Sequence, residues 1–223
     1  MNELELTGQV RTHVVQYVEP RMALQPIVAE ALLDMKYEAG KTGIIINPIS
    51  TFRDFKTQLK IWNNKFSGKR DLLSIDGSIL DRESLSTTEL IIAILRWSAL
   101  PGASRHHWGT EIDVVDLSTI PSNYRVQLVP EEFENSGPFE DLRIWMNGNL
   151  KRFGFFQPYK KAGLGVCPEP WHISFKAIAE EALENLTLAV IERTLKANFI
   201  FGKKEITKQL PEIYERFVIN IDP

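Results

Sequence analysis

Two short stretches, far apart in the chain, carry residue types that bind metal ions. The first contains His106, Glu111 and Asp113, and the second contains Glu169 and His172. Imidazole nitrogen together with carboxylate oxygen is a ligand set that zinc accepts. The two stretches are therefore predicted to form two halves of one metal site.

The chemistry of a hydrolytic zinc site assigns roles to these groups. A catalytic zinc takes three protein ligands and keeps one position for water, whose pKa falls to about 7. A carboxylate that is not a ligand must then accept the proton of that water. On this interpretation His106, Asp113 and His172 are the ligands and Glu169 is the base. A cationic group must also meet the substrate, and Arg53 offers one.

These residues lie in three motifs that resemble those of the D-alanyl-D-alanine carboxypeptidase family of zinc peptidases. That family includes the VanY and VanX types and shares its fold with the hedgehog signalling domain. The motifs are Ser50-x-x-Arg53 with Gln58 five residues on, Ser104-x-His106-x-x-Gly109-x-x-x-Asp113, and Glu169-x-x-His172. The resemblance spans roughly residues 45 to 175, and the two metal motifs together are much more specific than either alone.

The resemblance implies one zinc ion per chain, bound by His106, Asp113 and His172, with Glu169 as the general base. It implies that Arg53 meets the carboxylate or the developing oxyanion of the substrate. The implied reaction is hydrolysis of the terminal D-Ala-D-Ala bond of peptidoglycan stem peptides, which makes a peptidoglycan-derived peptide the expected partner.

Two further side chains, Gln58 and Ser104, are implied to lie in the same pocket and to bind substrate. Three alternatives stay open: an endopeptidase acting on peptidoglycan cross-bridges, an L,D-carboxypeptidase of the same family, and a non-catalytic zinc-binding module. Retention of Glu169 argues against the module, because a structural zinc has no use for a proton acceptor and usually has a fourth protein ligand.

Two positions depart from the family pattern. Glu111 stands where a small residue, often alanine, is common, and Thr51 stands where glycine is common. The added carboxylate of Glu111 could orient a ligand, bind a substrate amine or lie outside the pocket.

Three other residues are rival candidates for the metal: His13, His107 and Cys167. Neighbours on an extended segment face opposite ways, so only one of His106 and His107 should reach the ion. The family pattern favours His106. For His13 an ordinary hydrogen-bonded role is favoured, and for Cys167 a small buried side chain near the site.

The segments around the motifs predict a single α+β domain with a central antiparallel sheet flanked by helices. Apolar spacing and turn residues predict helices over 25–40, 54–66, 90–97, 139–153, 176–198 and 205–218, and strands over 44–46, 110–115 and 171–175. Within the single domain of residues 1–223, residues 67–103 are predicted to be an insertion over the active site. Residues 176–223 are predicted to be a helical C-terminal extension.

Composition limits the remaining possibilities. Hydrophobic residues at 43% and charged residues at 25% are ordinary for a globular chain of 223 residues, which suits one domain. A net charge of -3 gives no reason to expect nucleic acid as a partner, and no apolar run approaches the ~20 residues of a membrane span. We expect a monomer or weak homo-oligomer of bacterial origin. It would be cytoplasmic if the acidic start is natural, and periplasmic or in the cell envelope if a leader has been removed.

Overall fold

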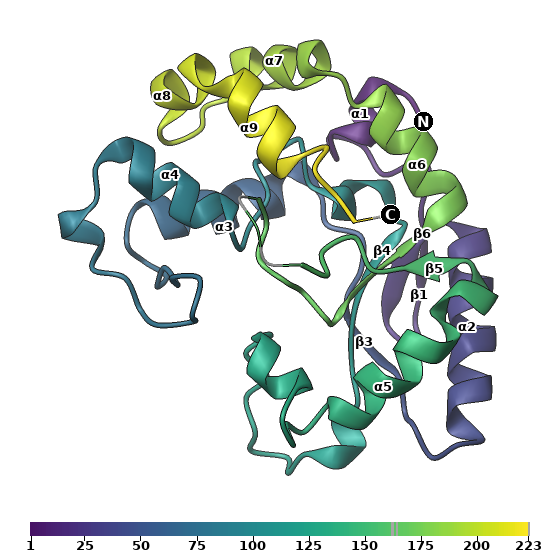
Figure 1. The fold of residues 1–223 in the computed structure, drawn as a ribbon. Coiled ribbons are helices and arrows are strands. Elements are labelled where there is room, and N and C mark those ends of the chain that lie inside the picture. The colour runs from purple at the N-terminus through teal and green to yellow at the C-terminus, as the bar shows by residue number, and fades with distance from the viewer. Residues whose placement is uncertain (162, 164, 223) are drawn as a thin grey trace.

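A four-stranded antiparallel sheet lies at the centre of the fold, with the strand order β3-β4-β6-β5 (Figure 1). The computed structural model describes residues 1–161, 163 and 165–222. The strands of the central sheet are β3 (Asn47–Ser50), β4 (Glu111–Val115), β5 (Phe155–Phe156) and β6 (His172–Phe175). Two further strands, β1 (Val15–Tyr17) and β2 (Met22–Leu24), form a separate hairpin. The predicted α+β domain with an antiparallel sheet is confirmed.

Helices surround the sheet on several sides (Figure 1). The α-helices are α1 (Glu3–Leu6), α2 (Pro26–Gly40), α3 (Phe55–Phe66), α4 (Thr87–Leu95), α5 (Glu140–Asn149), α6 (Lys176–Asn185), α7 (Leu188–Ala197), α8 (Lys203–Lys208) and α9 (Leu210–Phe217). Short 3₁₀ helices are η1 (Arg82–Ser84), η2 (Arg105–Trp108), η3 (Leu117–Thr119), η4 (Pro130–Phe133) and η5 (Leu150–Phe153). None of the helices in the described part of the chain has the length and apolar character that a bilayer crossing requires.

The two faces of the central strands have different chemistry because side chains alternate along a strand. Ile112, Val114 and Ile173 are fully buried in a core shared with α2 and α5. Glu111 and Asp113 therefore point to the opposite face of β4. A second core joins α3, α4 and the C-terminal helices α6 to α9.

One predicted strand is wrong. The apolar run 44–46 is not a strand, because the ladder with β4 begins at Asn47, which pairs with Val115. The backbone N–H of Ile45 instead donates to the Asp116 carboxylate at 2.9 Å. Pro48 is tolerated in β3 because β3 is an edge strand.

The two predicted C-terminal helices are each divided. The predicted helix over 176–198 breaks after α6, where the Thr187 side chain accepts a hydrogen bond from the Val190 N–H and begins α7. The predicted helix over 205–218 begins earlier, at Lys203, and divides before α9, which places Pro211 in the first turn. Residue 223, the last of the predicted C-terminal extension, lies outside the described residues.

Candidate metal centre

Strand register brings two of the predicted ligands together. In the antiparallel pair of β4 and β6, Asp113 lies directly opposite His172, and Ser50 of β3 pairs with Asp113 on the other side. Residues opposite one another on such strands have side chains about 5 Å apart on the same face. The meeting of a residue at position 113 with one at position 172 is therefore a consequence of sheet pairing.

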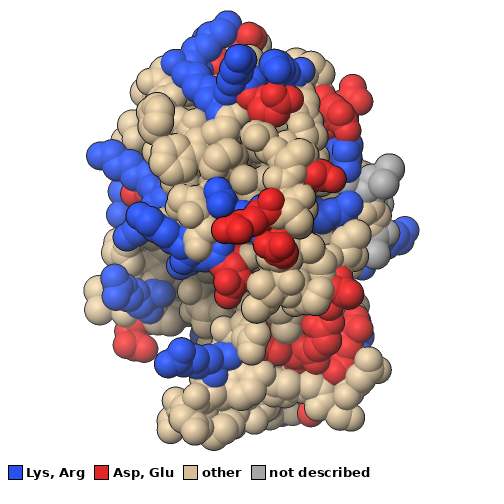
Figure 2. All heavy atoms as spheres, turned by 90° about the vertical axis from the view of Figure 1, so that its left-hand side faces the viewer, with Lys and Arg blue, Asp and Glu red and all other residues tan. Residues whose placement is uncertain are grey.

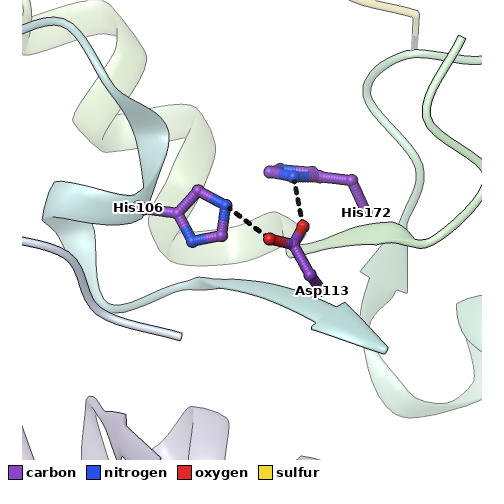
Figure 3. A group of neighbouring side chains, drawn as sticks. All are labelled: His106, Asp113 and His172. Carbon is purple, nitrogen blue, oxygen red and sulfur yellow. Dashed lines mark hydrogen bonds and ion pairs between the residues drawn. The ribbon is translucent and has the colours of Figure 1, made fainter. Parts of the chain in front are cut away.

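The third predicted ligand, His106, reaches the same point from η2, the short helix that precedes β4. Its Nε2 lies 3.4 Å from Asp113 Oδ2, and His172 Nδ1 lies 3.1 Å from Asp113 Oδ1. Figure 3 shows the three side chains pointing toward one another. One ligand atom from each lies within 4.8 Å of the others. Zinc ligands about 2.0–2.2 Å from the ion are about 3.3 Å apart in a tetrahedron, so these residues could hold a metal ion.

Hydrogen bonds on the far side of each imidazole select the nitrogen that faces the site. His106 Nδ1 contacts the Thr51 carbonyl oxygen at 2.8 Å, and as a donor to that oxygen it leaves Nε2 free as a ligand. His172 Nε2 lies 2.7 Å from Glu111 Oε2, which leaves Nδ1 for the metal. Such outer partners fix the tautomer and ring orientation of metal-binding histidines.

Glu111 is held in a buried polar network next to His172. It is fully buried, and its Oε1 accepts hydrogen bonds from Ser174 at 2.7 Å, Thr110 at 3.0 Å and Arg105 at 3.3 Å. Burial raises the pKa of Glu111, but Arg105 and His172 outweigh it and bring that pKa to about 2. Of the three alternatives for Glu111, the structure therefore favours the one in which it orients His172, a predicted ligand.

The sequence motifs do not mark Arg105 and Ser174 as members of this network. Ser174 lies two residues after His172 on β6, so strand alternation alone puts it on the same face. Arg105 is 4% exposed, and its guanidinium carbon lies 4.8 Å from the centre of the Trp108 ring. The hydrogen bond from Arg105 to Glu111 depends on this packing, which no sequence pattern indicates.

Glu169 lies beside the three predicted ligands without belonging to their cluster. Its Oε2 is 3.5 Å from His172 Nδ1, and its backbone N–H donates to the Tyr159 carbonyl oxygen at 2.9 Å. Burial raises the pKa of Glu169 to about 7, with His172 acting in the opposite direction and Asp113 adding to the rise. A carboxylate with this pKa can take and return a proton near neutral pH.

Arg53 lies on the segment between β3 and α3 and faces the same site. Its Nη2 is 3.9 Å from Asp113 Oδ2 and donates to Ser50 Oγ at 3.1 Å, and its Nη1 donates to Gln58 Oε1 at 2.9 Å. Gln58 is fully buried and also donates to the Ala99 carbonyl oxygen. The predicted proximity of Gln58 to Arg53 is present, but the side chain lies behind the guanidinium, where it can orient Arg53.

A cleft of about 300 Å³ opens over these groups. It is lined by the three predicted ligands and by Arg53, Ser104, Glu169 and Tyr159, among others. Residues of the predicted insertion also line it, including Arg70, Leu95 and Trp97. Figure 2 shows a hollow on one face of the molecule, with Lys and Arg side chains along one side of it and Asp and Glu side chains along the other. Gln58 is absent from the lining, whereas Ser104 is present, so Ser104 is placed where it can contact a ligand.

The rival ligands lie elsewhere in the described part of the chain. His107 is fully buried, with Nδ1 2.6 Å from the Arg53 carbonyl oxygen and Nε2 accepting from the Gly102 N–H. Burial lowers the pKa of His107 to about 3, so this imidazole is neutral. His13 contacts the His107 carbonyl oxygen at 2.8 Å. Cys167 is buried and is not in the cluster of potential ligands.

More than half of the sequence matches a known family. A family model described as VanY, D-alanyl-D-alanine carboxypeptidase, matches residues 21–178. The chain therefore belongs to the VanY family of D-alanyl-D-alanine carboxypeptidases.

Two uncharacterised proteins of Haemophilus influenzae are similar in sequence to this chain. One is 33% identical over 122 residues, which cover 54% of this chain and 93% of that protein. The other is 39% identical over 98 residues, which cover 43% of this chain and 67% of that protein. Because both relatives are uncharacterised, neither indicates an activity for this chain.

Two solved structures share the fold. VanYB in complex with D-alanine-D-alanine has a TM-score of 0.55 and 20% identity, with 83% of this chain and 90% of that chain covered. A mutant of the vancomycin resistance D,D-pentapeptidase VanY in complex with Zn(II) has a TM-score of 0.52 and 22% identity, with 78% and 83% covered. At this identity the likeness establishes the fold.

Proposed function

We propose that this chain is a zinc-dependent D,D-carboxypeptidase that hydrolyses the terminal D-Ala-D-Ala bond of peptidoglycan stem peptides. The observation that carries the proposal is the buried group of His106, Asp113 and His172 with the unliganded Glu169 beside it. The zinc complex of a VanY mutant and the D-alanine-D-alanine complex of VanYB support the choice of metal and substrate.

Each residue of the cleft has a separate role in the proposed reaction. When bound, zinc would polarise the scissile carbonyl and lower the pKa of a water molecule. Glu169 accepts the proton of the attacking water and returns it to the leaving amine. Arg53, oriented by Gln58 and Ser50, binds the terminal carboxylate of the peptide. Ser104 contributes a further polar contact in the cleft.

The substrate assignment is tested with a panel of stem peptides scored by mass. A D,D-carboxypeptidase releases D-alanine from peptides ending in D-Ala-D-Ala and leaves peptides ending in L-Lys-D-Ala intact. Release from the latter would make the chain an L,D-carboxypeptidase, and cleavage inside a peptide with an amidated terminus would make it an endopeptidase. A zinc-loaded protein that cleaves none of the panel would favour the non-catalytic module.

We expect Arg53→Lys to lower kcat/KM on a D-Ala-D-Ala peptide about 30-fold or more, mainly through KM. Lysine keeps the charge but loses the paired donors that match a carboxylate, and a hydrogen bond to a charged group contributes roughly 1.5–3 kcal/mol. Steady-state kinetics on free-acid and C-terminally amidated peptides measure the effect.

The amidated peptide and a neighbouring lysine supply the controls. Lys56→Gln, at an exposed position on the first turn of α3, should leave kcat/KM unchanged. If Arg53→Lys lowers kcat on the amidated peptide as much as on the free acid, Arg53 stabilises the oxyanion and does not read the terminus.

We expect Glu111→Gln to weaken zinc binding about 10- to 100-fold, the range for lost outer partners of ligand histidines. Glutamine keeps the shape of the side chain but removes the charge that holds His172 Nε2 at 2.7 Å. Competition with a chromophoric chelator measures the zinc affinity, and the absorption spectrum of the Co²⁺ form reports the ligand geometry. Unchanged affinity and an unchanged Co²⁺ spectrum would remove Glu111 from the metal centre.

Three further assignments accompany the proposal. The predicted insertion over 67–103 shapes the rim, because Arg70, Leu95 and Trp97 line the cleft. The predicted C-terminal extension also reaches the cleft, through Phe217 of α9. The protein is assigned as a monomer or a weak homo-oligomer, because one chain supplies all the residues that the mechanism uses.

A further inference from the structure

Lys65 and Arg70 are two basic residues of the cleft that the proposed mechanism does not use. Lys65 lies in the last turn of α3 and is half-buried, and Arg70 lies in the exposed segment that follows. Arg53 also lines the cleft, and it has an acidic neighbour in Asp113. Among the described residues, neither Lys65 nor Arg70 forms an ion pair within 4.0 Å.

The surroundings of Lys65 are unfavourable for a cation. Burial is the main cause that lowers the pKa of its ammonium to about 8, with Glu169 acting in the opposite direction and the nearby Arg70 and Arg53 adding to the decrease. Removing a charged group from water without a partner is costly. Perturbed charges that line a cleft are typical of functional sites.

The charges of the cleft are also unbalanced. Its lining carboxylates are Asp113 and Glu169, whereas Arg105 is paired with Glu111 behind the metal site. A divalent ion would add two positive charges to those of Arg53, Lys65 and Arg70. A peptide with one terminal carboxylate, bound by Arg53, would neutralise only part of this excess. The cleft as a whole therefore favours a ligand with more than one negative charge.

We propose that Lys65 and Arg70 form a second anion subsite, which binds a carboxylate of the peptide other than the one at its terminus. The inference rests on the proposed function and deepens it. It assigns the substrate to acidic peptides that carry a side-chain carboxylate on the amino side of the scissile bond. The position of Lys65 and Arg70 in the same cleft as Arg53 and Glu169 lets one peptide reach both anion sites.

Matched peptides that end in D-Ala-D-Ala test the subsite. In each pair the third or fourth residue from the terminus carries a side-chain carboxylate or the corresponding carboxamide, so that charge is the only difference. Binding to the zinc-loaded Glu169→Gln variant is measured by calorimetry, and kcat/KM is measured on the parent. At one of the two positions we expect the carboxylate peptide to bind about tenfold more tightly, as for one charge-assisted hydrogen bond.

Variants that remove one positive charge each show which residues cause the preference for the carboxylate peptide. On the Glu169→Gln background, Lys65→Met and Arg70→Gln should each reduce the carboxylate-to-carboxamide ratio toward one. Lys69→Gln removes the same charge from an exposed neighbour that does not line the cleft, and it should keep the ratio. High salt should lower the carboxylate-to-carboxamide ratio of the Glu169→Gln protein that keeps both Lys65 and Arg70, because screening weakens the ion pairs.

The outcomes separate this inference from the proposed function. Equal binding of the paired peptides at both positions would overturn the subsite, even if the parent hydrolyses all of them. A preference that survives Lys65→Met and Arg70→Gln would also overturn it. If the parent hydrolyses no peptide, the proposed reaction fails, and the binding ratio still decides whether the subsite exists.

Discussion

Glu169→Gln is expected to lower kcat on a D-Ala-D-Ala peptide by about 10²-fold or more while leaving the metal content unchanged. The amide has nearly the same shape, so it preserves the packing around His172 Nδ1, which lies 3.5 Å from the carboxylate. What the variant loses is the group that accepts and returns the proton. Release of D-alanine is measured together with zinc per chain on the same preparation.

A control variant and a contradicting outcome make this test specific. Glu184→Gln, on the exposed surface of α6, changes the charge equally and should leave the rate unaffected. A Glu169→Gln variant that releases D-alanine at the parental rate would show that another group is the base.

The pH dependence should follow from the same carboxylate. Burial raises the pKa of Glu169 to about 7, and the ion would lower it. Only the deprotonated form can act as a base, so kcat/KM should fall as pH falls below a value at or under about 7. The residual activity of Glu169→Gln should lack this acidic limb.

Asp113→Ala is expected to weaken zinc binding roughly 10²- to 10³-fold and to reduce hydrolysis to background. Asp113 contacts both His106 and His172, and the two imidazoles hold its pKa well below the usual range despite burial. The loss follows from dividing the apparent ~10–16 kcal/mol of a four-ligand zinc site among its ligands.

Asp141→Ala provides the matched control on the exposed face of α5. Circular dichroism shows whether each variant keeps its fold. If the folded Asp113→Ala variant binds zinc as tightly as the parent, Asp113 is not a ligand.

The sequence predicted the meeting of the three potential ligands because motif spacing and strand alternation determine it. Asp113 and His172 lie on neighbouring strands, and the family resemblance selected His106 over His107. The buried position of Gln58 was not predictable, because spacing places it near Arg53 without showing which of the two faces the cleft. The strand pattern places the Glu111 and His172 side chains on the same face of the sheet. It does not show that they are in contact, because that depends on side-chain packing.

Local apolar patterns were less informative than the motifs. The isoleucines at 44–46 suggest a strand. However, the Asp116 side chain accepts a hydrogen bond from the N–H of Ile45, and the strand pairing with β4 begins at Asn47. The long apolar periodicity over 176–198 continues through a helix break, because the capping residue Thr187 has no effect on that periodicity. Tertiary hydrogen bonds of this kind determine where an element begins.

Zinc titration of the chelated protein, with D-alanine release followed at each addition, tests the metal-centre proposal most directly. The proposal predicts that chelation abolishes release, that one equivalent of zinc per chain restores it, and that Asp113→Ala is not restored by the same equivalent. Full hydrolysis by parent protein that retains no stoichiometric metal would contradict the proposal.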